Sequence, residues 1–375
     1  MQRFIHQIFV LFIFLLVSPF GFTQDQQVTP SPTLEDKVAW YDTTQWGNEG
    51  RGWTDTTTHF TRIPARAKGK VTDAVFSLAQ NSAGLIVRFK TDAPKILVRH
   101  EVGGNLTMPH MTTVGSSGLD LYAKDENGLW RWAGHSRPSG KKYDSTMLET
   151  TPTLKEYQIY LPLYNNTLSL SVGVPEGCHF EAVAPSSQKP VLYYGSSITH
   201  GCSASRPGMS VPAILGRRFD RPVINFGFSG SAKMERELAE LIGEVDAAVF
   251  VIDSLPNMSP AMVKERSEIF IRELRKARPE TPIILIEDRT NSNAWLKPEL
   301  LKSHREQRAF LRATYEKLLA EGMTGLSYIE GELLLGNDNE GTVDGSHPTD
   351  LGMVRMADIL EPVLRKVLDE VSDKK

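Results

Sequence analysis

Cysteine is scarce in this sequence, with only Cys178 and Cys202 among 375 residues. In an exported protein the two could form a disulfide if the fold brings their Cα atoms close enough, and two free buried thiols are the alternative. The nine histidines show no HExxH or Cys–His spacing, so we expect no catalytic metal. The sequence also lacks a GxxxxGK phosphate loop and a GxGxxG motif after a strand, and we expect no cofactor.

A strong charge of either sign is lacking as well. The formal net charge is -3 at pH 7, which predicts no strongly basic face and argues against a nucleic-acid partner. Hydrophobic residues make up 40% of the chain and charged residues 23%, which is an ordinary globular composition. The length allows two domains or a single large one.

Long apolar runs are lacking except at the start of the chain, where residues 8–20 are almost entirely apolar. Arg3 precedes this run and small or polar residues follow it at 21–24, which is typical of a secretory signal peptide over residues 1–24. The run is short for a membrane span, so we expect no stable membrane insertion, with an uncleaved anchor as the alternative. The mature protein is therefore predicted to be exported, to the periplasm or the extracellular space.

Short alternating segments predict an N-terminal domain over residues 25–186. Gly, Asn, Asp and Pro separate them, and no long helical period occurs between residues 39 and 185. Many short strands at this spacing are typical of an antiparallel β-sandwich. The strand-like runs are 74–78, 84–89, 96–100, 158–161 and 168–174.

From residue 187 to 375 the pattern changes to apolar strands that alternate with amphipathic helices. This alternation predicts βαβ units and a parallel sheet, and we expect a flavodoxin-like, three-layer α/β/α domain. The expected strands are 191–194, 223–226, 247–252, 283–286 and 326–329. The expected helices are 211–219, 233–243, 260–277, 305–321 and 351–371.

Polar and glycine-containing loops follow these strands. Because the carboxyl ends of parallel strands meet at one edge of the sheet, the loops should lie close together. Glycine in such a loop leaves backbone N–H groups free to face a ligand. In chain order the loops supply Ser197, Gly230, Asn257, residues 287–289, and the pair Asp344 and His347 before the last helix.

These residue types suit acyl transfer. A serine hydroxyl is a weak nucleophile until a base takes its proton, and His347 could be that base while Asp344 orients its imidazole. The amides of Ser197 and Gly230 and the side chain of Asn257 could stabilise the developing oxyanion. Each residue also has a purely structural alternative, as a helix cap, a turn or a solvated loop. Their joint occurrence at strand ends favours the catalytic interpretation.

The domain resembles the SGNH, or GDSL-type, hydrolase superfamily. The matching blocks are GSSITHG at 195–201, NFGFSG at 225–230 and DGSHP at 344–348. The resemblance implies Ser197 as the nucleophile, Gly230 and Asn257 in the oxyanion hole, and Asp344 with His347 in the triad. The chain departs from the family pattern at Ser196, where aspartate is usual, and in the block that contains Asn257.

A second match lies in the N-terminal domain. The segment GLDLY at 118–122 resembles the GxDLY motif of a bacterial subgroup in which a jelly-roll-like β-sandwich precedes the SGNH domain. The resemblance then covers nearly the whole mature chain. An ordinary strand is the alternative, since apolar and polar residues alternate in this segment as they do in many strands.

An exported enzyme of this subgroup resembles carbohydrate O-acetyl esterases, which predicts an acetylated glycan or another small ester as the substrate. A lipid or thioester hydrolase for short acyl chains is one alternative, and a non-catalytic glycan-binding protein on the same scaffold is another. Arg206 is a candidate for substrate binding or for fixing its own loop by pairing with a carboxylate. The other candidate substrate-binding residues are His200, Glu287 and Trp130.

Overall fold

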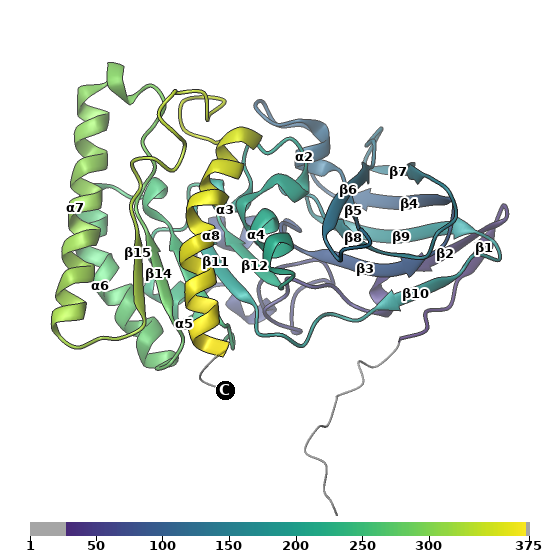
Figure 1. Ribbon diagram of the computed structural model, residues 1–375, viewed down its shortest axis with the longest axis horizontal. Coiled ribbons are helices and arrows are strands. Elements are labelled where there is room, and N and C mark those ends of the chain that lie inside the picture. Colours follow the sequence, from purple (N-terminus) through teal and green to yellow (C-terminus); the bar gives the residue numbers. More distant parts are fainter. Residues whose placement is uncertain (1–27, 373–375) are drawn as a thin grey trace, which may run out of the picture.

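The structure is a computed structural model that describes residues 28–372, and it consists of two parts that lie side by side (Figure 1). Strands β1 to β10 form two antiparallel sheets, and β11 to β15 form one parallel sheet. Pairing changes from antiparallel to parallel between β10 (Phe180–Val183) and β11 (Val191–Gly195). The predicted fold class is therefore confirmed. The predicted signal peptide lies outside the described residues.

The N-terminal part is a sandwich of two five-stranded sheets. One sheet has the order β1 (Thr33–Glu35), β2 (Val38–Asp42), β9 (Thr167–Pro175), β4 (Lys95–Val102) and β7 (Lys142–Glu149). The other has the order β10, β3 (Ile86–Thr91), β8 (Lys155–Tyr160), β5 (Asp120–Lys124) and β6 (Trp130–His135). Alternate residues of β4 are buried, as expected for a strand with one face on a core. Val98 and Val172 of one sheet meet Val87 and Ile159 of the other in that core.

The strand predicted at 74–78 is wrong, because this segment forms helix α1 (Asp73–Leu78). The side chain of Thr72 caps the helix by accepting a hydrogen bond from Val75 N at 3.3 Å. Five apolar-patterned residues fit one helical turn as well as a strand, so periodicity could not separate the two. Val75 packs with Ile224 and Phe226, so α1 belongs to the core of the parallel-sheet part.

The parallel sheet has the strand order β12-β11-β13-β14-β15, which is the 2-1-3-4-5 order of flavodoxin-like folds. The order reverses at β11, the first strand, and in open sheets ligands bind beyond the carboxyl ends of the strands at that point. Every residue of β11 is buried, as its unbroken apolar run predicts. The other strands are β12 (Val223–Gly227), β13 (Val249–Asp253), β14 (Ile283–Ile286) and β15 (Leu326–Ile329).

Helices cover both faces of this sheet. Neighbouring residues of β11 point to opposite faces of the sheet and pack in different cores. Tyr194 packs in the core that includes Phe270 of α6 (Pro260–Ala277). Tyr193 packs in the core that includes Met356 of α8 (Asp350–Ser372). One face carries α5 (Arg236–Gly243), α6 and α7 (Pro298–Ala320). The other carries α4 (Val211–Phe219) and α8, the yellow helix in front of the sheet in Figure 1.

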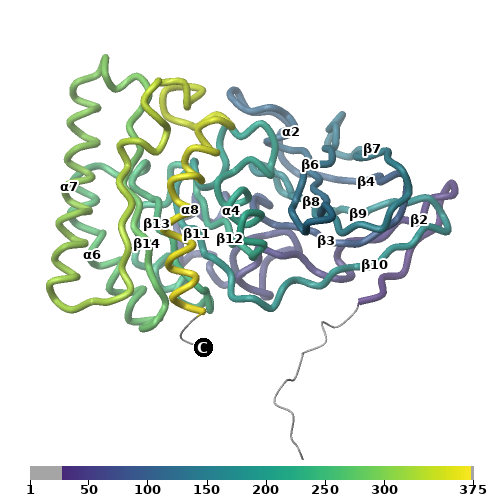
Figure 2. The backbone as a smooth tube through the Cα atoms, viewed as in Figure 1, coloured from purple at the N-terminus to yellow at the C-terminus, as the bar shows by residue number. Residues whose placement is uncertain are grey.

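Two predicted helices begin several residues from the expected start. Helix α7 begins seven residues before the expected start, at Pro298, which suits the first helical turn. Helix α5 begins at Arg236 because the preceding Met234 has a φ of 54°, which a right-handed helix does not allow. No helix within residues 28–372 is long and apolar enough to cross a membrane. The backbone trace shows the short helix α2 (Thr113–Ser117) of the N-terminal part facing the parallel-sheet part (Figure 2).

Candidate active site

A sharp turn at the end of β11 presents Ser197. The turn needs glycine at 195, because a Cβ there would lie 2.5 Å from the carbonyl oxygen of Asp253. Helix α3 (Ser197–His200) then begins, capped by Ser196, whose hydroxyl accepts a hydrogen bond from Ile198 N at 3.2 Å. Serine and aspartate both cap helices well, so the departure from the family pattern at Ser196 preserves this local geometry.

The structure brings Ser197, His347 and Asp344 together. Ser197 Oγ lies 2.9 Å from His347 Nε2, although the two residues are 150 positions apart. His347 Nδ1 lies 2.7 Å from Asp344 Oδ2. Ser197 is 7% exposed, so its hydroxyl is largely shielded but reachable. This is the hydrogen-bonded order of nucleophile, base and orienting carboxylate that acyl transfer requires.

Asp344 is held as a carboxylate. Burial by itself would raise the pKa of Asp344, but hydrogen bonds from His347 N, the His347 ring and Ser346 N lower it to about 2. The two backbone bonds to Oδ1 measure 2.8 and 2.9 Å. The aspartate therefore stays ionised at any ordinary working pH, and its second oxygen, Oδ2, binds the imidazole.

Gly230 and Asn257 lie on neighbouring loops beside the nucleophile turn. Gly230 has a φ of 66°, which glycine tolerates, and a Cβ there would meet no atom within 4 Å. The loop is tied to the turn because Phe228 N donates to Gly195 O at 2.9 Å. Asn257 Nδ2 donates to the carbonyl oxygens of Phe228 and Ala232, each at 3.2 Å. Asn257 thus braces the Gly230 loop, and its role as an oxyanion donor stays a prediction.

His110 also reaches the site, and sequence reasoning did not single it out. It lies in the connection from β4 to α2, in the N-terminal part of the chain. Its ring stacks on His347 with centroids 5.3 Å apart, and its Nε2 lies 3.1 Å from Cys202 Sγ. Cys202 and Cys178 are both free, so the disulfide alternative is not realised. No local pattern marks His110, because its partners are 92 or more residues away.

Two other candidates are buried structural residues. His200 is fully buried, and its ring stacks on Tyr164 with centroids 4.2 Å apart. Burial, and then the charge of Arg62, hold the pKa of His200 well below its usual range, so it stays neutral. Glu287 is buried at the end of β14, where it accepts hydrogen bonds from Tyr328 Oη at 2.7 Å and Gly331 N at 2.8 Å. Neither side chain is placed to meet a substrate.

Arg206 pairs with a carboxylate, as one of its two predicted roles requires. Its Nη1 lies 2.7 Å from Asp120 Oδ2, and the same oxygen accepts a hydrogen bond from Gly208 N at 2.9 Å. Asp120 is the aspartate of the GLDLY segment and is fully buried. The motif therefore ties the sandwich to the loop that follows the nucleophile.

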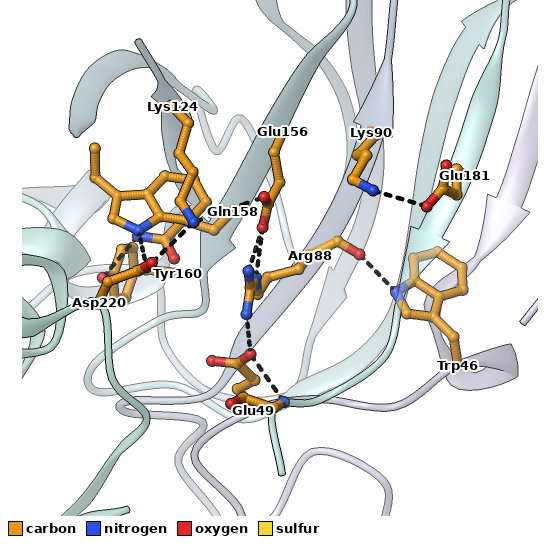
Figure 3. Close-up of polar contacts among 12 residues, drawn as sticks. Trp46, Glu49, Arg88, Lys90, Lys124, Glu156, Gln158, Tyr160, Glu181 and Asp220 are labelled. Atoms are coloured by element: carbon orange, nitrogen blue, oxygen red, sulfur yellow. Dashed lines mark hydrogen bonds and ion pairs between the residues drawn. The ribbon is translucent and has the colours of Figure 1, made fainter. Parts of the chain in front are cut away.

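Trp130 lies near the amino ends of the parallel strands, whereas Ser197 lies at their carboxyl ends. Its indole nitrogen donates to Asp220 Oδ1 at 2.8 Å, and Asp220 precedes β12, whereas Ser197 follows β11. Figure 3 shows Asp220 beside Lys124, and nearby Arg88 between Glu49 and Glu156. Substrate contact by Trp130 is therefore not supported by its position.

Comparisons with known proteins show the family to which this chain belongs. Residues 188–365 match the GDSL-like lipase/acylhydrolase family, and residues 38–180 match the N-terminal domain of SGNH-type esterases. A protein described as a GDSL-like lipase, from Bacteroides ovatus ATCC 8483, shares 34% sequence identity, with 88% of this chain and 98% of that chain covered and a TM-score of 0.85. This chain belongs to the GDSL-like lipase/acylhydrolase family. As a member of that family it is an ester-bond hydrolase.

More distant structures share the fold of this GDSL-like hydrolase. The salicylyl-acyltransferase SsfX3 from a tetracycline biosynthetic pathway is 17% identical, with a TM-score of 0.70 over 90% of this chain and 97% of its own. A family two carbohydrate esterase from Cellvibrio japonicus is 11% identical, with a TM-score of 0.52 over 92% of this chain and 95% of its own. No curated protein matches the sequence.

Proposed function

We propose that this hydrolase is a carbohydrate O-acetyl esterase that uses Ser197, His347 and Asp344 as a catalytic triad. One observation carries the proposal: Ser197 Oγ, His347 and Asp344 are joined by hydrogen bonds of 2.9 and 2.7 Å at the carboxyl edge of the sheet. Gly230 and the backbone N–H of Ser197 complete the site as oxyanion donors.

The first half of the reaction forms an acyl-enzyme. Nε2 of His347 accepts the proton of Ser197 as Oγ attacks the ester carbonyl carbon. The carbonyl oxygen becomes an oxyanion, which the N–H groups of Ser197 and Gly230 stabilise. The imidazolium then gives its proton to the sugar oxygen, so the carbon–oxygen bond breaks and the alcohol leaves.

The second half regenerates the serine. His347 takes a proton from water, whose oxygen attacks the acyl carbon, and the imidazolium returns that proton to Ser197 Oγ as acetate leaves. Asp344 stays ionised in both halves and stabilises the imidazolium without accepting its proton.

A glycan substrate is supported by two features. The fold is shared with a family two carbohydrate esterase. Trp132 exposes 51% of its surface and lies over Arg206, with the guanidinium carbon 5.4 Å from the ring centroid. The indole is anchored because its nitrogen donates to Asp120 Oδ1 at 2.9 Å. Exposed, fixed aromatic faces suit stacking on sugar rings. We therefore propose that Trp132, and not Trp130, stacks on a sugar ring of the substrate.

Acetate release tests the substrate class. Purified protein is incubated with a panel of acetylated oligosaccharides and, in parallel, with nitrophenyl esters of increasing chain length, with Ser197→Ala as the blank. We expect acetate release from at least one glycan and a steep fall of rate with acyl length. Faster turnover of long-chain esters than of any acetylated glycan would instead assign a lipid-type acylhydrolase.

We also propose that the protein acts after export, in the periplasm or outside the cell. The support is the apolar run at residues 8–20 with its basic and polar flanks. The N-terminal sequence of the protein recovered from culture fractions tests this. An intact Met1 in a cytoplasmic fraction would contradict it.

A further inference from the structure

Three potential metal ligands converge beside the nucleophile. They are His110 from the N-terminal part, Cys202 from the turn after α3, and His347 from the loop before α8. One donor atom from each lies within 4.8 Å of the other two. His110 Nε2 and Cys202 Sγ are already 3.1 Å apart. The mechanism above uses only His347 of these three, so the other two need a separate explanation.

Two imidazoles and one thiol form a donor set typical of Zn²⁺ and similar divalent transition-metal ions. Zinc bond lengths place the nitrogen and sulfur ligands of one tetrahedral ion about 3.5 Å apart. The His110–Cys202 spacing of 3.1 Å is close to this value, and no donor pair is more than 4.8 Å apart, so modest side-chain movements would bring all three donors onto one ion. Three protein ligands would leave a fourth position open, which water or Ser197 Oγ could occupy.

The surroundings of His347 match those of a metal-bound histidine. Such histidines usually donate their second ring N–H to a carboxylate, which fixes the ring and strengthens the ligating nitrogen. His347 Nδ1 has this partner in Asp344 Oδ2 at 2.7 Å. The only ring nitrogen left for a metal is therefore Nε2, the atom that faces Ser197 Oγ.

We propose that His110, Cys202 and His347 bind a divalent transition-metal ion that inhibits the esterase. The ion takes the lone pair of His347 Nε2, the thiol of Cys202 releases its proton as the metal–sulfur bond forms, and Ser197 loses its base. Metal binding is independent of the proposed function, whereas the inhibition rests on it. The ion has no part in the reaction, so a chelator would relieve inhibition without lowering the rate.

Spectroscopy with Co²⁺ tests the site without reference to activity. Cobalt bound to a thiolate gives a sulfur-to-metal charge-transfer band in the near ultraviolet and strong tetrahedral bands in the visible. We expect both bands in the full-length protein, their displacement by Zn²⁺, and loss of the charge-transfer band in Cys202→Ser. Cys178→Ser is the matched control, because Cys178 is partly buried against the core of the sandwich and its replacement should leave both bands unchanged.

Zn²⁺ titration of the esterase rate then tests whether the bound ion inhibits the enzyme, with each variant compared with its own metal-free rate. The half-inhibitory Zn²⁺ concentration should rise at least about tenfold in Cys202→Ser and in His110→Gln, and stay unchanged in Cys178→Ser and His179→Gln. Equal Zn²⁺ sensitivity of all four variants, or no charge-transfer band in the wild type, would overturn the proposal. A band that depends on Cys202 in a protein inactive on every ester would uphold the metal site and reject the esterase function.

Discussion

Arg62 donates a hydrogen bond from Nη1 to the carbonyl oxygen of Gly227 at 2.9 Å, at the last residue of β12. The same nitrogen binds Asn225 O at 3.0 Å, and Nη2 and Nε bind Leu78 O and Asn81 O. The guanidinium is fully buried, and this burial lowers its pKa to about 9. An arginine from the N-terminal half thus holds the strand end that leads to Gly230.

Replacing Arg62 by methionine should destabilise the protein by about 3 to 5 kcal/mol, because four carbonyl oxygens, two buried and two partly buried, would each lose a charged donor. Urea unfolding of the full chain measures this free energy. Arg66→Met is the matched control, since Arg66 is half exposed and its solvent-screened ion pair with Glu244 should contribute little to the stability. Equal stability of the two variants would show that the Arg62 contacts contribute little.

Ser197→Ala should abolish ester hydrolysis while leaving the thermal midpoint nearly unchanged. The hydroxyl supplies one bond to His347 and little packing, but without it only binding and the oxyanion hole remain. The rate should fall at least roughly thousandfold, as measured with nitrophenyl acetate and scanning calorimetry. Retention of more than a few per cent of the rate would mean that another residue attacks.

Arg289 holds the loop that carries Asp344 and His347, and it is buried just after β14. Its Nε donates to Ser346 O at 3.3 Å, and its Nη2 binds the Ser346 hydroxyl. Because Ser346 lies between Asp344 and His347, Arg289→Met should lower kcat roughly 10- to 100-fold with little change in KM. Arg312→Gln is the control, as Arg312 is 40% exposed and contacts no residue of this loop. A normal kcat for Arg289→Met would remove the positioning role.

Asp253 should make stability depend on pH. Burial, followed by the nearby charge of Asp288, raises the pKa of Asp253 to about 7, against about 3.9 in an unfolded chain. Between these values the folded protein keeps a proton that the unfolded chain has released, so this group lowers the free energy of unfolding as pH rises. Asp253→Asn removes the effect, while its amide oxygen can still accept a hydrogen bond from Thr199.

The variant Asp253→Asn should therefore be more stable than the wild type near pH 8, by up to roughly 4 kcal/mol, and equal to it near pH 4. Urea unfolding at several pH values checks this. Asp246→Asn, at an exposed aspartate, controls for the substitution itself. A constant difference between Asp253→Asn and wild type across the range would refute the raised pKa.

Sequence patterns predicted the features of the fold that depend on short segments of the chain. The parallel strands are mostly apolar, and 283–286 and 326–329 match β14 and β15 at both ends. The residues that meet at the site could be chosen because parallel strands bring their carboxyl ends together. Helix α1 was missed because its five apolar-patterned residues fit either period, and tertiary packing against Phe226 decides between them.

Contacts between distant segments left no local signal. Arg62 and His110 act on residues more than ninety positions away, and each stands in an unremarkable loop sequence. Trp130 and Trp132 are two residues apart on one strand, yet Trp130 meets Asp220 and Trp132 meets Arg206. The two side chains differ only in which part of the parallel-sheet region they meet when the sandwich docks on it. The sequence pattern of the strand therefore could not show which tryptophan is the better candidate for substrate binding.

The central claim is that Ser197 is the nucleophile and that His347 activates it. Fluorophosphonate labelling of the full chain, followed by peptide mass mapping, tests this most directly, because the probe reacts with activated serines. We predict one adduct, on the peptide that carries Ser197, and its loss in His347→Ala with the fold intact by circular dichroism. An adduct on a different residue, or equally fast labelling of His347→Ala, would contradict the account.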